Sequence, residues 1–152
     1  MQIKTVGELI EWTRTMHELL AQCLTNCASN HGDERAASLL TYVAAHEAEM
    51  EKMVAEFEQE ANSRASDTYV YDYIPHNMIT AHSVCDALCA KLDIDEIRAG
   101  IFNFHKQINA LYRTLLGTAV IPEATTLLQS LLDMEENQTK RLASQIGRMD
   151  DL

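Results

Sequence analysis

Four long stretches of the chain repeat apolar residues at steps of three and four, which is the spacing of one face of an α-helix. They cover about residues 5–29, 33–61, 94–117 and 122–146. Only 5 Gly and 2 Pro occur in 152 residues, so the chain lacks the turn residues that an all-β fold needs. We therefore expect an all-α protein.

Residues at the ends of these stretches fit helix boundaries. Thr5 with Glu8, and Asp93 with Glu96, have the spacing of a capping box. The turn at residues 30–33 supplies an N-cap for the second helix. Because this turn and the one between the third and fourth helices are short, each pair of helices should form an antiparallel hairpin.

The two expected hairpins, about residues 5–62 and 93–150, are separated by a long connection of about residues 63–92. This connection holds an aromatic stretch at residues 69–73 and has room for a short helix at residues 79–91. A connection of this length can return the chain along the whole length of a bundle. The sequence thus predicts a single-domain four-helix bundle over residues 1–152, made of two hairpins joined by one long crossover.

The two hairpins also resemble each other. Sliding the chain on itself by 88 positions superimposes the two capping boxes and many apolar positions without a gap. The same shift places His17 on His105 and Glu47 on Glu135. The coincidence of caps, apolar positions and polar exceptions suggests an internal repeat.

The polar exceptions point toward the interior. At about 100° per residue, His17, Glu47, His105 and Glu135 fall on or near the apolar faces of their helices. Each lies on a different helix, and the His-to-Glu separation is 30 residues in both hairpins. A buried ionised carboxylate costs several kcal/mol unless it is paired. We therefore expect one polar layer in which each glutamate faces either a protonated imidazole or a bound cation.

With these helices, this crossover and this layer, the chain resembles the ferritin-like superfamily, which includes ferritins, bacterioferritins and rubrerythrins. In that family a dimetal site uses one Glu on helices one and three, and a Glu-x-x-His motif on helices two and four. Here both motif glutamates, Glu47 and Glu135, are present. Three residues after each of them, where the family has His, this chain has Met50 and Gln138. His17 and His105 stand where the family has its single glutamates.

The resemblance implies a metal site with altered ligands. Two carboxylates balance the charge of one divalent ion, so one ion of Fe, Zn or Mn is more plausible electrostatically than two. Alternatively, the histidines have exchanged places with the carboxylates and two metals remain, or the layer is a metal-free hydrogen-bond network. The predicted ligands are His17, Glu47, His105 and Glu135, and the residues that can surround them are His46, Met50, Tyr112 and Gln138.

These alternatives correspond to different functions. A metal-binding bundle would serve iron handling or redox chemistry, whereas a bundle that has lost its metal would serve a structural or protein-interaction role. A third alternative is an apolar small-molecule pocket near Met50 and Tyr112. The sequence names no substrate, and whether the protein is an enzyme stays open.

Charge and apolar surface bear on partners and location. With 12 Lys+Arg against 23 Asp+Glu, the net charge of −11 argues against nucleic acid and anionic membranes as partners. The first residues do not resemble a signal peptide, and no apolar run reaches membrane-spanning length, so we expect a cytoplasmic protein. Some large apolar residues lie off the main apolar stripes, namely Trp12, Leu19, Phe102 and Leu132. They predict a homodimer, unless the crossover covers them within one chain.

The four cysteines form two pairs at helical spacing, Cys23 with Cys27 and Cys85 with Cys89. Paired thiols can hold a metal, but cysteine is also a small core residue. In an intracellular chain we expect free thiols that serve packing.

Overall fold

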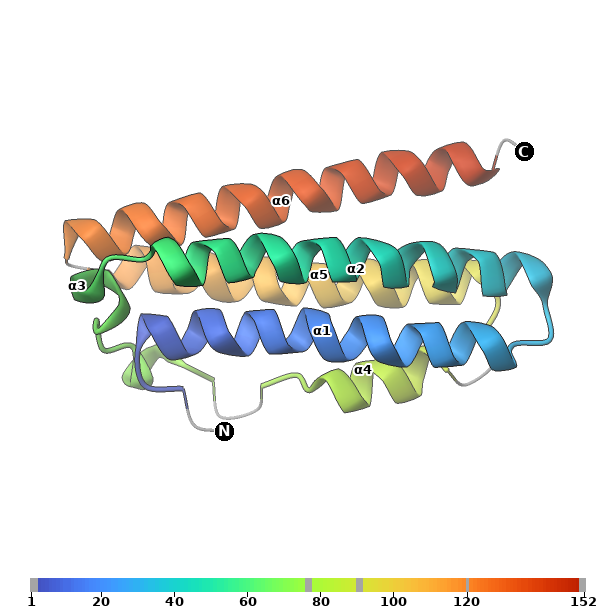
Figure 1. Cartoon of the computed structure of the whole chain (residues 1–152), viewed down its shortest axis with the longest axis horizontal. Coiled ribbons are helices and arrows are strands. Elements are labelled where there is room, and N and C mark those ends of the chain that lie inside the picture. The colour runs from blue at the N-terminus through green and yellow to red at the C-terminus, as the bar shows by residue number, and fades with distance from the viewer. Residues whose placement is uncertain (1–2, 76–77, 90–91, 120, 151–152) are drawn as a thin grey trace.

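Four long helices lie side by side and enclose one apolar core (Figure 1). They are α1 (Val6–Asn30), α2 (Glu34–Glu60), α5 (Ile94–Thr118) and α6 (Pro122–Asp150). This computed structural model describes residues 3–75, 78–89, 92–119 and 121–150. The predicted all-α four-helix bundle is confirmed. Within the described part of the chain, no helix has both the length and the apolar character that crossing a membrane requires.

The helix boundaries follow the internal repeat. Helix α5 begins and ends 88 residues after α1, and α6 begins 88 residues after α2. Helix α6 is longer than the apolar pattern predicts, because it continues past Ile146 to Asp150. The two hairpins are therefore built on nearly the same plan.

The two expected capping boxes differ in the structure. At α5 the box is complete: Glu96 N–H donates to Asp93 Oδ1 at 2.8 Å, and Asp93 N–H donates to Glu96 Oε1 at 3.2 Å. At α1, Glu8 N–H donates to Thr5 Oγ1 at 3.2 Å, but the Glu8 carboxylate accepts from the Thr5 hydroxyl at 3.3 Å instead of from the backbone. Only the first half of the predicted box is present there.

The complete box at α5 gives a first prediction. Replacing Asp93 with alanine removes the acceptor for an N-terminal N–H group and should lower the free energy of unfolding by about 1 kcal/mol. Asp93→Asn keeps a side-chain oxygen and should stay close to the wild type. Urea denaturation of the three proteins measures both effects, and equal midpoints for Asp93→Ala and the wild type would contradict this role.

The described part of the crossover contains three short helices, α3 (Ser63–Ser66), the 3-10 helix η1 (Tyr71–Tyr73) and α4 (Ala81–Leu88). The expected helix at residues 79–91 is thus present but shorter, and residues 90–91 lie outside the described residues. Val70 N–H donates to Lys4 C=O at 2.8 Å and Val6 N–H donates to Thr68 C=O at 2.9 Å, which ties the crossover to the start of α1. Helix α4 then packs along α1 and α5 (Figure 1).

The apolar residues outside the main stripes have different environments. Trp12 is half-buried and shares a surface cavity of about 250 Å³ with Pro75, Met78 and Ile79 of the crossover. Leu132 is buried, whereas Leu19 is exposed. The crossover therefore lies beside Trp12 without burying it fully, and the homodimer stays a prediction.

Candidate functional site: a buried polar layer

One titratable side chain from each long helix lies in the middle of the core. His17 of α1, Glu47 of α2, His105 of α5 and Glu135 of α6 are all 0% exposed. The structure thus brings together the four residues that the sequence places in one layer. They lie close together because equal positions in two antiparallel hairpins fall at similar depths along the bundle.

The ring of His17 lies between the two glutamates. Its Nδ1 atom is 2.5 Å from Glu47 Oε2, and its Nε2 atom is 2.9 Å from Glu135 Oε1. An imidazole can donate from both nitrogen atoms only when it is protonated. The geometry therefore fits an imidazolium that bridges two carboxylates, one in its own hairpin and one in the other.

His105 repeats only part of this pattern. Its Nε2 atom lies 2.7 Å from Glu47 Oε1, although the angle is not that of a hydrogen bond. Two other buried atoms, His105 Nδ1 and Glu135 Oε2, have no hydrogen-bond partner among the described residues. By the internal repeat, these two atoms correspond to the bonded pair His17 Nδ1 and Glu47 Oε2. Close contacts therefore join His17 to Glu47, His17 to Glu135 and His105 to Glu47. Between His105 and Glu135 the described residues form no such contact, and we call this the open side of the layer.

Charge governs the protonation of this layer. Burial alone would lower the pKa of His17, but the charges and hydrogen bonds of Glu135 and Glu47 outweigh burial and raise this pKa to about 10. Burial would raise the pKa of Glu47, yet His105 and His17 hold it well below its usual range. At neutral pH, Glu47 is therefore ionised and His17 is protonated.

Two further expected residues, Met50 and Tyr112, lie inside the core without joining the layer. Met50 is fully buried. Tyr112 is also buried, and its hydroxyl lies 2.6 Å from Thr13 Oγ1, one helical turn before His17. Burial raises the pKa of Tyr112, with a further contribution from the charge of Glu135. Tyr112 is therefore a neutral hydrogen-bonding group beside the layer.

His46 and Gln138 lie at the edge of the core. The ring of His46 is 6.2 Å from that of His105, centroid to centroid, and its Nε2 atom is buried without a hydrogen-bond partner among the described residues. Burial lowers the pKa of His46. Gln138 is half-buried. Of the surrounding residues, His46 is thus the one that offers a nitrogen ligand near the open side.

The remaining histidines lie elsewhere. His31 Nε2 is 3.1 Å from Leu92 C=O, and His82 forms an ion pair with Asp86 at 3.1 Å. His76 lies outside the described residues. In the described part of the chain, these contacts place neither His31 nor His82 at the layer.

The donor set of the layer does not fit a two-iron carboxylate centre. Such a centre uses four carboxylates and two imidazoles, whereas two carboxylates and two imidazoles line this layer. Two carboxylates with neutral imidazoles would balance one divalent ion, and the unpartnered nitrogen and oxygen on the open side are ligand atoms of the right kind. The donor set therefore matches one ion in charge and in ligand type, although among the described residues the ligand atoms of the layer do not lie as close together as those of a formed metal site.

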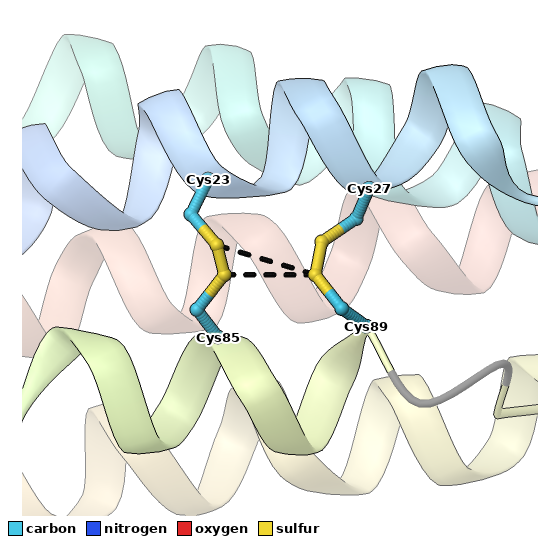
Figure 2. Close-up of side chains that lie close together, drawn as sticks. All are labelled: Cys23, Cys27, Cys85 and Cys89. Atoms are coloured by element: carbon cyan, nitrogen blue, oxygen red, sulfur yellow. Dashed lines mark hydrogen bonds between the residues drawn. A yellow bond between two sulfur atoms is a disulfide. The ribbon is translucent and has the colours of Figure 1, made fainter.

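The cysteines form a second cluster, which the sequence reasoning missed. Cys23 pairs with Cys85 and Cys27 with Cys89, across the contact between α1 and α4 (Figure 2). The expectation of four free thiols that serve packing is therefore wrong. The equal i, i+4 spacing of the two pairs was the available signal, because it places both members of each pair on one helix face.

Comparisons with known proteins identify the fold. No model of a known protein family matches the chain, and no curated protein does either. The crystal structure of a Thermotoga maritima protein, provisionally described as a ferritin-like diiron-carboxylate protein, superposes with a TM-score of 0.60. The match covers 92% of this chain and 93% of that chain at 16% sequence identity. The chain therefore has the ferritin-like fold.

Proposed function

We propose that this ferritin-like bundle binds one divalent metal ion in its buried polar layer, through His17, Glu47, His105 and Glu135. The observation that carries the proposal is the open fourth side of the layer. There, a buried imidazole nitrogen and a buried carboxylate oxygen lack partners among the described residues. Buried polar groups without partners are rare in folded proteins, and an ion or a water molecule commonly explains them.

The charges in the layer support the same proposal. The protonated His17 offsets one negative charge, whereas the layer holds two buried carboxyl groups. A second positive charge is needed, because an uncompensated charge in an apolar core is costly. A divalent metal ion supplies it once His17 has released its proton, so that both imidazoles are neutral ligands.

The metal determines what chemistry the site offers. A bound iron or manganese ion would supply redox chemistry in a core shielded from water, and a zinc ion would supply Lewis acidity. The residues of the chain hold the ion and exclude solvent. Iron handling or oxidoreductase activity is the function that we infer for an iron-loaded form.

A second candidate function is a metal-free bundle with a structural or protein-interaction role. The observation that favours it is the position of His17, which already bridges Glu47 and Glu135 in the place where a cation would otherwise be needed. The contact of His105 Nε2 with Glu47 Oε1 at 2.7 Å extends this network to the fourth residue without a metal. In that case the partner surface, and not the core, carries the function.

Manganese binding tests the proposal, because Mn²⁺ prefers nitrogen and oxygen ligands to thiolates. We expect the metal-free protein to take up about one Mn²⁺ per chain, measured as loss of the EPR signal of free Mn²⁺. The variant His105→Ala/Glu135→Gln removes the two atoms of the open side, so it should bind at least about ten-fold more weakly.

The matched control is His82→Ala/Glu49→Gln, which replaces one exposed histidine and one exposed glutamate. It should bind Mn²⁺ like the wild type, and circular dichroism should show all three proteins folded. If a folded wild-type protein takes up none of Mn, Fe or Zn at the layer, the metal proposal fails and the metal-free bundle stands.

A further inference from the structure

The four cysteines meet on one side of the bundle, between α1 and α4 (Figure 2). Cys23 and Cys27 lie one turn apart on α1, and Cys85 and Cys89 lie one turn apart at α4 (Figure 2). All four Sγ atoms lie within 4.8 Å of one another. The facing sides of α1 and α4, which lie far apart in the sequence, thus bring four sulfur atoms close together.

The distances between the pairs resemble those of a metal thiolate site. Cys23 Sγ lies 4.0 Å from Cys89 Sγ, and Cys85 Sγ lies 3.5 Å from Cys89 Sγ. Zinc binds thiolate sulfur at about 2.3 Å in a tetrahedron, which separates any two sulfur atoms by about 3.8 Å. The sulfur atoms of different disulfide pairs are therefore already about as far apart as in a tetrahedral zinc site. Only the two sulfur atoms within each pair would have to separate after reduction.

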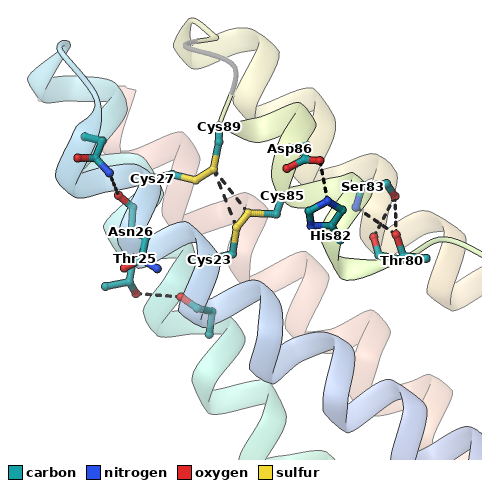
Figure 3. Close-up of a disulfide and its surroundings, with 12 residues drawn as sticks. Cys23, Thr25, Asn26, Cys27, Thr80, His82, Ser83, Cys85, Asp86 and Cys89 are labelled. Atoms are coloured by element: carbon teal, nitrogen blue, oxygen red, sulfur yellow. Dashed lines mark hydrogen bonds and ion pairs between the residues drawn. A yellow bond between two sulfur atoms is a disulfide. The ribbon is translucent and has the colours of Figure 1, made fainter. Parts of the chain in front are cut away.

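The cluster is also accessible from solvent. It borders a surface cavity of about 440 Å³, which His31, His82 and Asp86 also line. Cys85 is buried, whereas Cys23, Cys27 and Cys89 are half-buried. His82 and Asp86 lie near Cys85 on the same side of the bundle (Figure 3). A metal ion or a small oxidant can therefore reach the sulfur atoms without opening the core.

We propose that the four cysteines form a redox-sensitive zinc site. In the reduced protein, the thiolates of Cys23, Cys27, Cys85 and Cys89 bind one Zn²⁺. The two disulfides, Cys23–Cys85 and Cys27–Cys89, are the oxidised and metal-free form of the same site. Either form joins α4 to α1, so the crossover stays attached while the metal content changes.

The interconversion balances with a peroxide as oxidant. Four thiolates lose four electrons, two S–S bonds form, and the zinc leaves as Zn²⁺ without changing its oxidation state. Two molecules of hydrogen peroxide accept the four electrons with four protons, their O–O bonds break, and four molecules of water form. A dithiol reductant reverses the disulfide formation and restores the ligands.

The cluster belongs to one half of the internal repeat. The positions on α5 that correspond to Cys23 and Cys27 are Leu111 and Leu115, both buried in the core. The polar layer, by contrast, uses corresponding residues of both halves. The two sites can therefore be changed separately.

Zinc analysis of the full-length protein tests the proposal. Reduced wild-type protein supplied with Zn²⁺ and then desalted should lose one zinc ion per chain when two equivalents of hydrogen peroxide are added. Mass spectrometry should show the loss of four hydrogen atoms per chain. Cobalt in place of zinc should give the intense thiolate-to-metal absorption of a tetrahedral sulfur site.

Three double variants separate the possible results. Cys23→Ser/Cys27→Ser and Cys85→Ser/Cys89→Ser should each lack this zinc ion and the cobalt absorption. The second variant changes only Cys85 of α4 and Cys89 at its C-cap, so it serves if the first fails to fold. His105→Ala/Glu135→Gln should keep both, which separates this site from the metal proposed in the core.

Reduced wild-type protein that binds no zinc released by peroxide would overturn the proposal. So would cysteine variants that retain the zinc and the cobalt absorption. Manganese binding at the polar layer does not enter these results, so either proposal can fail while the other stands.

Discussion

Replacing His17 with alanine should lower the free energy of unfolding of the metal-free protein by about 3–5 kcal/mol. The substitution removes the positive charge between Glu47 and Glu135 and leaves both carboxylates buried and facing a cavity. Chemical denaturation at pH 7 with a chelator present measures the loss. The exposed His82→Ala variant should differ from the wild type by no more than about 0.5 kcal/mol.

A second variant distinguishes the lost charge from the lost volume. Replacing all four residues of the layer with apolar residues of similar size removes every buried charge at once. Such replacements of buried ion pairs are often neutral or stabilising by about 1–4 kcal/mol. If His17→Ala proves as stable as the wild type, or if the apolar quadruple variant is as unstable as His17→Ala, the charge argument is wrong.

The stability of the metal-free protein should also fall as the pH rises from about 6.5 to about 10. The folded state holds the pKa of His17 at about 10, against 6.5 for an unperturbed histidine. Folding therefore favours the protonated form, and this contribution is complete below pH 6.5 and lost as the pH passes through about 10. The difference in pKa corresponds to a contribution on the order of 5 kcal/mol.

The carboxylate of Glu47 has the opposite dependence. Because its pKa is lowered on folding, its contribution is present above about pH 4.5, the usual value, and is lost as the pH falls further. Denaturation midpoints of the wild type and of His17→Gln at several pH values isolate the histidine. A constant difference between the two proteins from pH 6 to pH 10 would contradict a raised pKa of His17.

The sequence predicts much of this fold because the helices are long and amphipathic. Over several turns, an inward position can be assigned from the helix period alone, and His17 and Glu135 are therefore placed correctly. The internal repeat supplies the relative depth of the two hairpins, since residues 88 positions apart occupy equal levels. The bounds of α1 and α5 agree with this shift at both ends.

The contacts within the layer and the cysteine cluster could not be predicted in the same way. Which nitrogen of His17 faces which glutamate depends on side-chain rotation, about which helix periodicity says nothing. The cysteine cluster depends on where α4 docks, and a helix of eight residues in a long connection carries too little pattern to fix its neighbours. Its position follows from packing against α1 and α5.

The polar layer also fixes the alignment of the two hairpins. Apolar helices can slide past each other by one turn, about 5.4 Å, and still bury similar residues. In this bundle such a slip would carry His17 and Glu47 away from Glu135 and His105, and all four charged or polar groups would face aliphatic side chains. The four residues therefore favour one register of the two hairpins over others that would pack similarly. A purely aliphatic core would lack this preference.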